Sequence, residues 1–336
     1  MSLRLAQVGY GYWGRNLLRV FSSTPGARMV AACDSLPASR AALTAEYPSI
    51  AVDEDFGTLL ARKEVDAVIV ATPAGRHYAQ VKQALEADKH VFVEKPMALT
   101  VEEATELREL SRARKRTLMV GHTFLFNDAV RWVKDFIDRG ELGEVYYAYF
   151  QRLNLGRVRQ DVDALWNLAP HDISIAQYWF GEKASSVHAQ GASFLQPGVE
   201  DISFLSLRYP SGRFANIHVS WIDPSKTRRA VIVGSNKMVL YDDTSADMRI
   251  VVYDKGIDRK KLDTSLGDYR TFDQFQLVQR AGDVWIPRIQ FREPLKVEAA
   301  HFVECVTEGR APLSDAQNGL DVVEALVAAR ASLQPS

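Results

Sequence analysis

Continuous apolar runs alternate with amphipathic stretches through residue 121 of this chain. Such runs are typical of parallel strands buried on both faces, and the stretches between them show the period of helices. We expect strands at 3–8, 29–33, 51–52, 66–71, 90–93 and 117–121. We expect helices at 16–21, 38–47, 56–62, 77–87 and 101–112. This alternation predicts an α/β Rossmann-type domain with a doubly wound parallel sheet.

The pattern changes near residue 122, where aromatic and β-branched segments take over. Short turns between them, such as 210–212, favour antiparallel hairpins. We expect strands at 145–152, 203–209, 213–221, 229–233, 238–241 and 250–253, and helices at 129–139, 172–180, 298–305 and 319–331. Residues 254–290 show no clear periodicity. We therefore expect two domains, a Rossmann domain at 1–122 and, at 123–336, an α+β domain with a mostly antiparallel open sheet.

Composition narrows the class of protein. A length of 336 residues favours two domains. A net charge of −1 provides no basic field for nucleic acid or for an anionic membrane, and no apolar run reaches membrane-spanning length. Cys33 and Cys305 cannot build a disulfide framework, and the first strand begins without a signal peptide. We expect a cytoplasmic protein.

A glycine-rich motif, Gly9-Tyr10-Gly11-Tyr12-Trp13-Gly14, separates the first strand from the first helix. In that context Gly9 permits the turn, Gly11 lets the backbone approach a pyrophosphate, and Gly14 allows close packing. Asp34 follows 20 residues after Gly14, at the end of the second strand. An acid there accepts hydrogen bonds from ribose hydroxyls and repels a 2′-phosphate, so NAD is favoured over NADP. The alternative is a glycine-rich turn without a ligand.

Three further segments follow strands and therefore face the same edge of the sheet: 71–77, Glu94-Lys95-Pro96 and Gly121-His122. Burial and a nearby nicotinamide would lower the pKa of Lys95 and suit it to proton transfer; the alternative is a surface lysine. His122, like His77, is alternatively a satisfied polar group at a strand end. We expect the cofactor to contact Thr72, Pro73, His77, Glu94 and Lys95 in addition to the glycine-rich motif and Asp34.

The segment Ala169-Pro170-His171-Asp172 carries the second candidate for acid–base chemistry. Pro170 can begin a helix, and Asp172 in its first turn suits the helix dipole. His171 at such an entrance is placed to act as a base, or alternatively caps or packs. Asn167 shares its helical turn if the backbone there is helical.

An arginine cluster flanks residues 154–156 and consists of Arg152, Arg157 and Arg159. Guanidinium groups bind phosphate through paired hydrogen bonds, which suits a nucleotide-sugar diphosphate; the alternative is a solvated loop. No spacing of carboxylates and histidines demands a metal, and we expect none.

Together these segments resemble the Gfo/Idh/MocA oxidoreductases, the family of glucose–fructose oxidoreductase and inositol dehydrogenase. The resemblance rests on the glycine-rich motif, Ala71-Thr72-Pro73 with His77, Glu94-Lys95-Pro96, and 169–172. It implies NAD(P)-dependent oxidation or reduction of a sugar or polyol carbon, with Lys95 as the catalytic lysine and His171 as the acid/base. Many members carry an aspartate where this chain has Asn167, and asparagine cannot accept a proton.

Residues 121–126 and 165–173 are similar to a bacterial subgroup that oxidises C3 of UDP-linked N-acetylglucosamine sugars for surface-polysaccharide assembly. The expected function is therefore an NAD-dependent sugar dehydrogenase for a nucleotide-linked or anionic sugar. A dehydrogenase of a free cyclitol or monosaccharide, a non-catalytic NAD-binding regulator, and an enzyme that recycles its NAD in place remain alternatives. The residues expected to contact the substrate are Lys95, His122, Arg157, Asn167 and His171.

The strand expected at 145–152 is rich in aromatic residues, namely Tyr146, Tyr147, Tyr149 and Phe150. Alternate residues of a strand face opposite sides of the sheet, so some of these rings are expected on a face that their own domain leaves uncovered. The sequence therefore predicts a homo-dimer or homo-tetramer.

Overall fold

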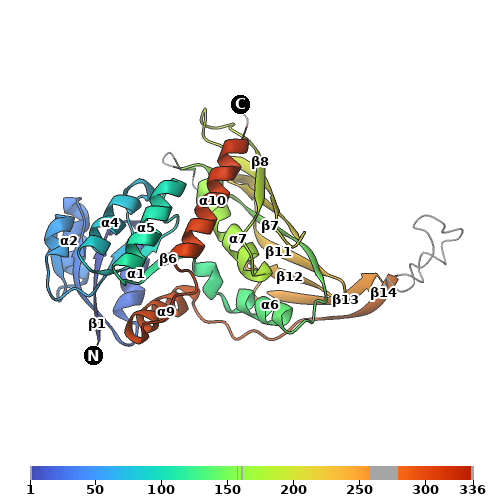
Figure 1. Ribbon diagram of the computed structural model, residues 1–336, viewed down its shortest axis with the longest axis horizontal. Coiled ribbons are helices and arrows are strands. Elements are labelled where there is room, and N and C mark those ends of the chain that lie inside the picture. The colour runs from blue at the N-terminus through green and yellow to red at the C-terminus, as the bar shows by residue number, and fades with distance from the viewer. Residues whose placement is uncertain (1, 157, 160–161, 258–278, 334–336) are drawn as a thin grey trace, which may run out of the picture. The chain divides into compact units, whose positions relative to one another are not determined.

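The computed structural model describes residues 2–156, 158–159, 162–257 and 279–333. The chain forms two compact units, both drawn in Figure 1. One consists of residues 1–127 together with 292–327, and the other of residues 128–291 together with 328–336.

The first unit is built on a six-stranded sheet whose neighbouring strands are all parallel, in the order β3-β2-β1-β4-β5-β6. Its strands are β1 (Leu3–Val8), β2 (Ala27–Cys33), β3 (Ala51–Asp53), β4 (Ala67–Val70), β5 (His90–Glu94) and β6 (Leu118–Gly121). Its helices are α1 (Tyr12–Ser22), α2 (Pro37–Glu46), α3 (Phe56–Leu60), η1 (Ala74–Arg76), α4 (His77–Glu86), α5 (Val101–Ala113), η2 (Thr123–Phe126), α9 (Pro294–Glu308) and the first part of α10 (Ala316–Ser332). The predicted doubly wound sheet is confirmed.

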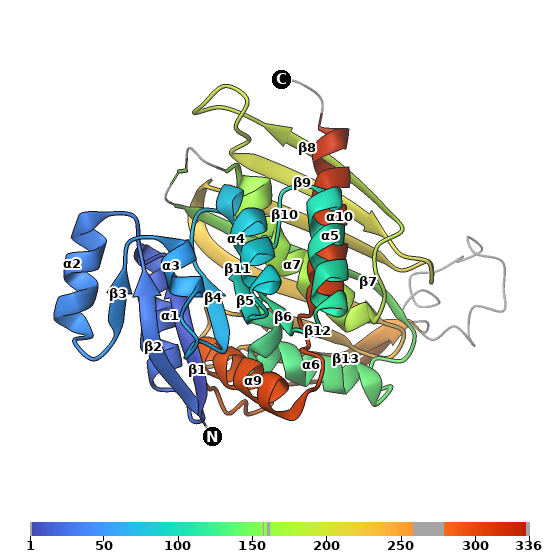
Figure 2. The ribbon, with the colours of Figure 1, turned by 60° about the vertical axis from the view of Figure 1, so that its left-hand side comes forward.

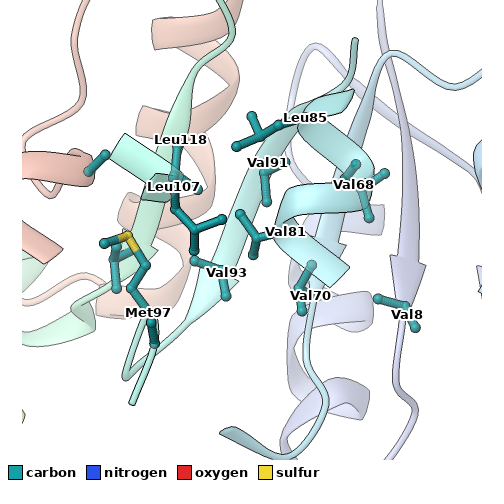
Figure 3. Packing of buried hydrophobic residues seen from close by; sticks show 14 of the residues in the cluster. Val8, Val68, Val70, Val81, Leu85, Val91, Val93, Met97, Leu107 and Leu118 are labelled. Atoms are coloured by element: carbon teal, nitrogen blue, oxygen red, sulfur yellow. The ribbon is translucent and has the colours of Figure 1, made fainter. Parts of the chain in front are cut away.

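Helices cover both faces of this sheet, which explains the continuous apolar runs in strands such as β4 and β5. Val91 and Val93 face α4 and α5, where they join one buried cluster (Figure 3), and Figure 2 shows these two helices side by side. Phe92 faces the opposite way, and its ring lies 5.4 Å from that of Phe21 in α1 and 5.8 Å from that of Phe302 in α9. Because successive side chains alternate between faces, β5 is buried on both.

The C-terminal segment returns to this first unit, in contrast to the division expected at residues 122/123. Leu320 and Val323 of α10 belong to the same buried cluster as β5, and the Val120 amide donates to the Ser314 carbonyl at 2.8 Å. Residues 292–327, expected in the second domain, therefore complete the first core. Apolar sheet surface must be covered by some helix, and the chain supplies that helix from a distant part of its sequence.

The second unit contains an eight-stranded sheet in the order β14-β13-β12-β11-β7-β10-β9-β8. Its strands are β7 (Val145–Leu155), β8 (Ser186–Ala192), β9 (Ile202–Arg208), β10 (Phe214–Ser220), β11 (Ile222–Gly234), β12 (Met238–Asp242), β13 (Ile250–Ile257) and β14 (Gln279–Trp285). Only the pairing of β7 with β10 is parallel among the described strands of this sheet. The predicted mostly antiparallel sheet is confirmed.

Two helices, α6 (Asp128–Asp138) and α7 (Ala164–Phe180), pack against this sheet. Trp179 of α7 stacks on Phe150 of β7, with ring centroids 5.6 Å apart. Tyr147 and Tyr149 of β7 and Phe204 of β9 are exposed instead. They occupy the face that α7 leaves open, as strand alternation requires.

Several elements differ from expectation. The sequence analysis placed no strand at β8 and left 254–290 unassigned; the structure extends β13 to Ile257 and places β14 at Gln279–Trp285. Residues 258–278 lie outside the described part of the chain. The thiols of Cys33 and Cys305 are free. None of the helices described is long and apolar enough to span a membrane.

Candidate cofactor and catalytic site

The glycine-rich motif forms the turn between β1 and α1, and its three glycines differ in their steric surroundings. Gly9 has a φ of +95°, and a Cβ there would lie 2.5 Å from the Ala71 carbonyl oxygen. At Gly14 a Cβ would lie 2.3 Å from the Gly9 carbonyl oxygen. A Cβ at Gly11 would have no atom within 4 Å. Gly9 and Gly14 therefore serve the turn, and the backbone at Gly11 is open to a ligand.

The residues around this turn fit a dinucleotide. Helix α1 begins at Tyr12 without a side-chain cap or an acid in its first turn, so its terminal N–H groups are suited to a pyrophosphate. Asp34 accepts hydrogen bonds from the Tyr10 amide at 2.7 Å and the Leu36 amide at 2.9 Å. A carboxylate offers about four lone-pair sites, so Asp34 retains the capacity to accept ribose hydroxyls.

His77 links two of the strand-end segments that the sequence analysis singled out. Its side chain is buried, with Nδ1 2.7 Å from the Pro96 carbonyl oxygen and Nε2 2.8 Å from the Thr72 carbonyl oxygen. Burial lowers the pKa of this imidazole. In the structure His77 thus holds the segments after β4 and β5 together; its contact with the cofactor stays a prediction, as does that of Pro73.

Glu94, the last residue of β5, is bound to the glycine-rich motif. Its Oε1 accepts a hydrogen bond from the indole nitrogen of Trp13 at 2.6 Å, and its Oε2 accepts one from the Lys95 amide at 3.3 Å. Gly121 is its register partner in β6, and a Cβ there would lie 3.1 Å from Glu94 Oε1. Burial raises the pKa of Glu94, against the opposing effect of these bonds and of the Lys95 charge. The sequence did not predict this Trp13–Glu94 bond.

Lys95 lies close enough to Glu94 and His122 for its charge to act on both. His122 is 1% exposed, and neither of its ring nitrogens has a hydrogen-bond partner among the described residues. Burial, assisted by the Lys95 charge, lowers the pKa of His122 to about 3. At neutral pH the His122 imidazole is therefore neutral.

His171 lies inside α7 and not at its start, so the expectation for this helix was wrong. The helix begins at Ala164, and its cap is Asp163, whose carboxylate accepts from the Trp166 amide at 2.8 Å. Pro170 stands in the middle of the helix. A proline there forgoes one helical hydrogen bond, and the burial of 12 residues of α7 offsets that loss. Asn167 and His171 are four residues apart and lie on one face of α7.

Arg152 does not belong to a phosphate-binding cluster. It is buried in β7, where Nε lies 2.9 Å from Asp172 Oδ2 and Nη2 lies 2.7 Å from Asp172 Oδ1. Asp172 therefore forms an ion pair and does not serve the helix dipole. Arg157, an expected substrate contact, lies outside the described residues. Arg159 is described, and its carbonyl accepts from Gln196 at 2.9 Å.

The first unit thus carries most of the expected cofactor residues, and the second carries Asn167 and His171. The structure adds Glu298, a buried glutamate of α9 that the sequence analysis overlooked. Its sequence signal is a glutamate at a helical position flanked by apolar residues, within Val297-Glu298-Ala299-Ala300. In the part of the chain that the structure describes, no group of three His, Cys, Asp or Glu residues is placed to hold a metal ion.

One unit has a parallel sheet with an open glycine turn, and the other has a large, mostly antiparallel sheet. This combination defines the class, a two-part dinucleotide-binding oxidoreductase. The model of the oxidoreductase family with an NAD-binding Rossmann fold matches residues 3–122. The model of the GFO/IDH/MocA C-terminal domain matches residues 130–240. This chain belongs to the GFO/IDH/MocA oxidoreductase family, and its N-terminal unit is an NAD-binding Rossmann domain.

Characterised relatives differ in their chemistry. The chain is 29% identical to 2,7-anhydro-N-acetylneuraminate hydratase of Mediterraneibacter gnavus, in a match covering 62% of this chain and 59% of that protein. It is 26% identical to scyllo-inositol 2-dehydrogenase (NAD(+)) of Bacillus subtilis, over 93% of this chain and 86% of that protein. The solved structure of UDP-N-acetylglucosamine 3-dehydrogenase from Acidithiobacillus ferrooxidans has the same fold, with a TM-score of 0.83, 22% identity, and coverage of 99% and 98%.

Proposed function

We propose that this chain transfers a hydride between a sugar hydroxyl carbon and the nicotinamide of NAD. The observation that carries the proposal is the link between Trp13 and Glu94, because it attaches the NAD-binding turn directly to the strand end that presents Lys95. That arrangement supports a lysine acting beside the bound dinucleotide. His122 carries no charge at this strand end at neutral pH, because burial lowers its pKa to about 3.

Each candidate residue has one role in this proposal. His171 takes the proton of the substrate hydroxyl, and Lys95 stabilises the negative charge that develops on the oxygen. Bound NAD would supply the hydride acceptor for the same carbon. Asn167 donates or accepts a hydrogen bond at a neighbouring hydroxyl, because an amide cannot take the proton itself.

The substrate that we propose is a nucleotide-linked or otherwise anionic sugar. A relative that acts on UDP-N-acetylglucosamine supports this class, whereas the relative that oxidises scyllo-inositol supports the alternative of a free cyclitol or monosaccharide. Arg152 forms an ion pair with Asp172, so one of the three arginines expected to bind a phosphate does not serve that role. The case for a diphosphate therefore depends on Arg157 and Arg159.

The likeness to a hydratase favours a second candidate, in which NAD is recycled in place and no NADH accumulates. A panel of UDP-sugars, free sugars and cyclitols separates the two, with NADH absorbance and product mass measured on the same samples. The first candidate requires NADH and a product two mass units lighter than the substrate. A changed product without free NADH supports the second candidate. Stoichiometric NAD binding without turnover on the whole panel contradicts both and supports a regulator.

Single-turnover rates of Lys95→Ala and His171→Ala test the proposed roles on the best substrate of the panel. Each substitution is expected to lower the rate roughly a hundredfold or more, the range expected for general acid–base groups. The double variant should lose less than the product of the two effects, since residues acting at one reacting carbon are non-additive. Lys63→Ala and His188→Ala, at exposed positions, serve as matched controls. Full activity in either test variant removes that residue from the mechanism.

A further inference from the structure

Glu298 is a fully buried acid that the proposed reaction does not use. It is 0% exposed in α9. Its Oε2 accepts a hydrogen bond from the Thr123 hydroxyl at 2.8 Å, and its Oε1 has no hydrogen-bond partner among the residues described. An isolated buried carboxylate is costly, so this side chain needs an explanation.

The packing of α9 on the sheet brings Glu298 toward Glu94. Phe92 and Glu94 alternate with Val93 in β5 and so share the face covered by α1 and α9. Phe92 contacts Phe302 on that face, with ring centroids 5.8 Å apart. Moving two residues along the strand, about 6.6 Å, leads from Phe92 to Glu94. Moving four residues back along the helix, about 6 Å, leads from Phe302 to Glu298.

The segment that follows β6 confirms this placement. Gly121 pairs with Glu94 in register, and Thr123, two residues later, donates to Glu298. The ring of Phe126 also lies 5.2 Å from that of His301, one helical turn after Glu298. Glu94 therefore lies against Gly121 and Glu298 against Thr123, close enough for the charge of Glu94 to act on Glu298.

The hydrogen-bond donors around the two carboxyl groups are unequal. Glu94 has two N–H donors, the Trp13 indole and the Lys95 amide, and the Lys95 charge favours its ionised form. Glu298 has one hydroxyl donor. Two carboxylates that share a buried site do not both ionise readily, so the negative charge belongs on Glu94 and the proton on Glu298. Burial and the Glu94 charge accordingly raise the pKa of Glu298 well above its usual range.

The remaining titratable groups nearby do not reverse this assignment. His122, beside Thr123, is neutral because burial holds its pKa at about 3. On α9 itself, His301 accepts the Leu313 amide at Nε2. On α1, Arg19 pairs with Glu293 near the start of α9. Lys95 is the cation whose charge reaches Glu94, and the charge acting on Glu298 is that of Glu94.

We propose that Glu94 and Glu298 form a buried carboxyl pair that holds one proton in the resting protein. Glu298 is then a positioning residue, because its neutral form leaves the Glu94 carboxylate, which lies beside Lys95, without a second negative charge next to it. The positive charge of the lysine ammonium and the negative charge of the Glu94 carboxylate then balance. Lys95 remains the cation at the proposed oxyanion site. This consequence for catalysis rests on the proposed function, whereas the shared proton itself does not.

Infrared spectroscopy of the full chain tests the shared proton, since a protonated carboxylic acid absorbs apart from carboxylates. At pH 8, above the pKa of about 7 to which burial raises Glu94, the wild-type protein should show a carboxylic-acid band that is lost in Glu298→Gln, which keeps the shape of a neutral acid. Glu308→Gln, an exposed glutamate on the same helix, should retain the band. Absence of the band in the wild type, or its persistence in a folded Glu298→Gln, overturns the proposal. If Glu298→Gln does not fold, the wild-type spectrum still decides, because the band must be present at pH 8, where Glu94 is ionised.

The pH profile of kcat/KM tests the positioning role. The infrared carboxylic-acid band of the wild type disappears over an alkaline pH range, and the wild-type kcat/KM profile should bend over the same range. Glu298→Gln should lack that bend, and Glu308→Gln should keep it. If Glu298→Gln and Glu308→Gln show the same bend, the positioning role of Glu298 is overturned. A protein that turns over no sugar contradicts the proposed function and leaves the infrared result standing, so the two failures are distinguishable.

Discussion

Arg152 and Asp172 form a bidentate ion pair inside the second unit, with nitrogen–oxygen distances of 2.9 and 2.7 Å. Arg152 belongs to β7, which pairs with both β10 and β11 in the sheet. Asp172 directly follows His171 in α7. The pair therefore fixes the turn of α7 that carries His171 against the middle of the sheet.

Breaking this pair should destabilise the protein strongly. In Asp172→Asn the buried Arg152 charge loses its partner, and such losses cost about 3–5 kcal/mol. The exposed pair between Arg139 and Asp135 in the same unit provides the control, because Asp135→Asn should cost about 1 kcal/mol or less. Urea unfolding measures both. Equal effects of the two substitutions would contradict the importance of burial here.

Two glycines of the same motif should respond differently to alanine. Gly9→Ala combines a positive φ with a contact at 2.5 Å to the Ala71 carbonyl, so the melting temperature should fall markedly. Gly11→Ala meets no protein atom and should melt like the wild type. It should nevertheless lower NAD affinity, because the methyl group occupies the space into which the pyrophosphate approaches. Thermal unfolding and titration calorimetry on both variants check this, and unchanged NAD affinity in Gly11→Ala would refute it.

Asp34 should determine the choice between the two dinucleotides. Removal of its charge in Asp34→Ala should weaken NAD binding and relax the preference against NADP, because the 2′-phosphate no longer meets a carboxylate. Asp55→Ala, at an exposed acid that caps α3, controls for the loss of a nearby charge. Calorimetry with both cofactors gives the answer. Tighter binding of NADP than of NAD by the wild type would show that the preference is wrong.

His122 should make the protein sensitive to acid. Its folded pKa of about 3 lies below the ordinary value of 6.5, so the unfolded chain binds a proton first as the pH falls. Stability is therefore complete above pH 6.5 and declines between pH 6.5 and 3, by up to about 1.4 kcal/mol per pH unit. His122→Phe should flatten this decline, and His188→Phe, exposed in β8, should not. Unfolding free energies at pH 7, 5 and 4 make the comparison; equal slopes in all three proteins would exclude His122 as the cause.

The open face of the second sheet should mediate self-association. Tyr147, Tyr149 and Phe204 are exposed there, and a dimer or tetramer would bury them. Light scattering at micromolar concentration should give a multiple of 37.6 kDa for the wild type. Tyr149→Glu should shift the mass toward the monomer, whereas Met248→Glu, an exposed residue between β12 and β13, should not. A monomeric wild type would refute the prediction.

Structural features that depend only on residues close together in the sequence could be predicted. The strands β4 and β5 follow from continuous apolar runs, since a strand covered on both faces has no polar side. The turn at Gly9 and the cap of α5, where Thr100 accepts from the Glu103 amide, follow from residues that interact within a few positions of one another. The family resemblance rested on such local motifs and was confirmed.

The beginning of α7 could not be predicted, because two local signals compete there. Pro170 is the stronger start signal in sequence, yet Asp163 caps the helix and the apolar residues between them pack on the sheet. The gain from burying that extra turn decides the outcome, and it exists only once the sheet is in place.

Pairings across long stretches of chain were decided by tertiary structure alone. Asp172 meets Arg152 across 20 residues, and Glu298 meets Thr123 across 175. Helical and strand periodicity relates residues at most a few positions apart, so it carries no information about such partners. The sequence by itself determined the class of fold and the cofactor motif. Which charges are neutralised and which acid is buried followed only from the packing of distant elements, since burial changes the free energy of a charge far more than local sequence does.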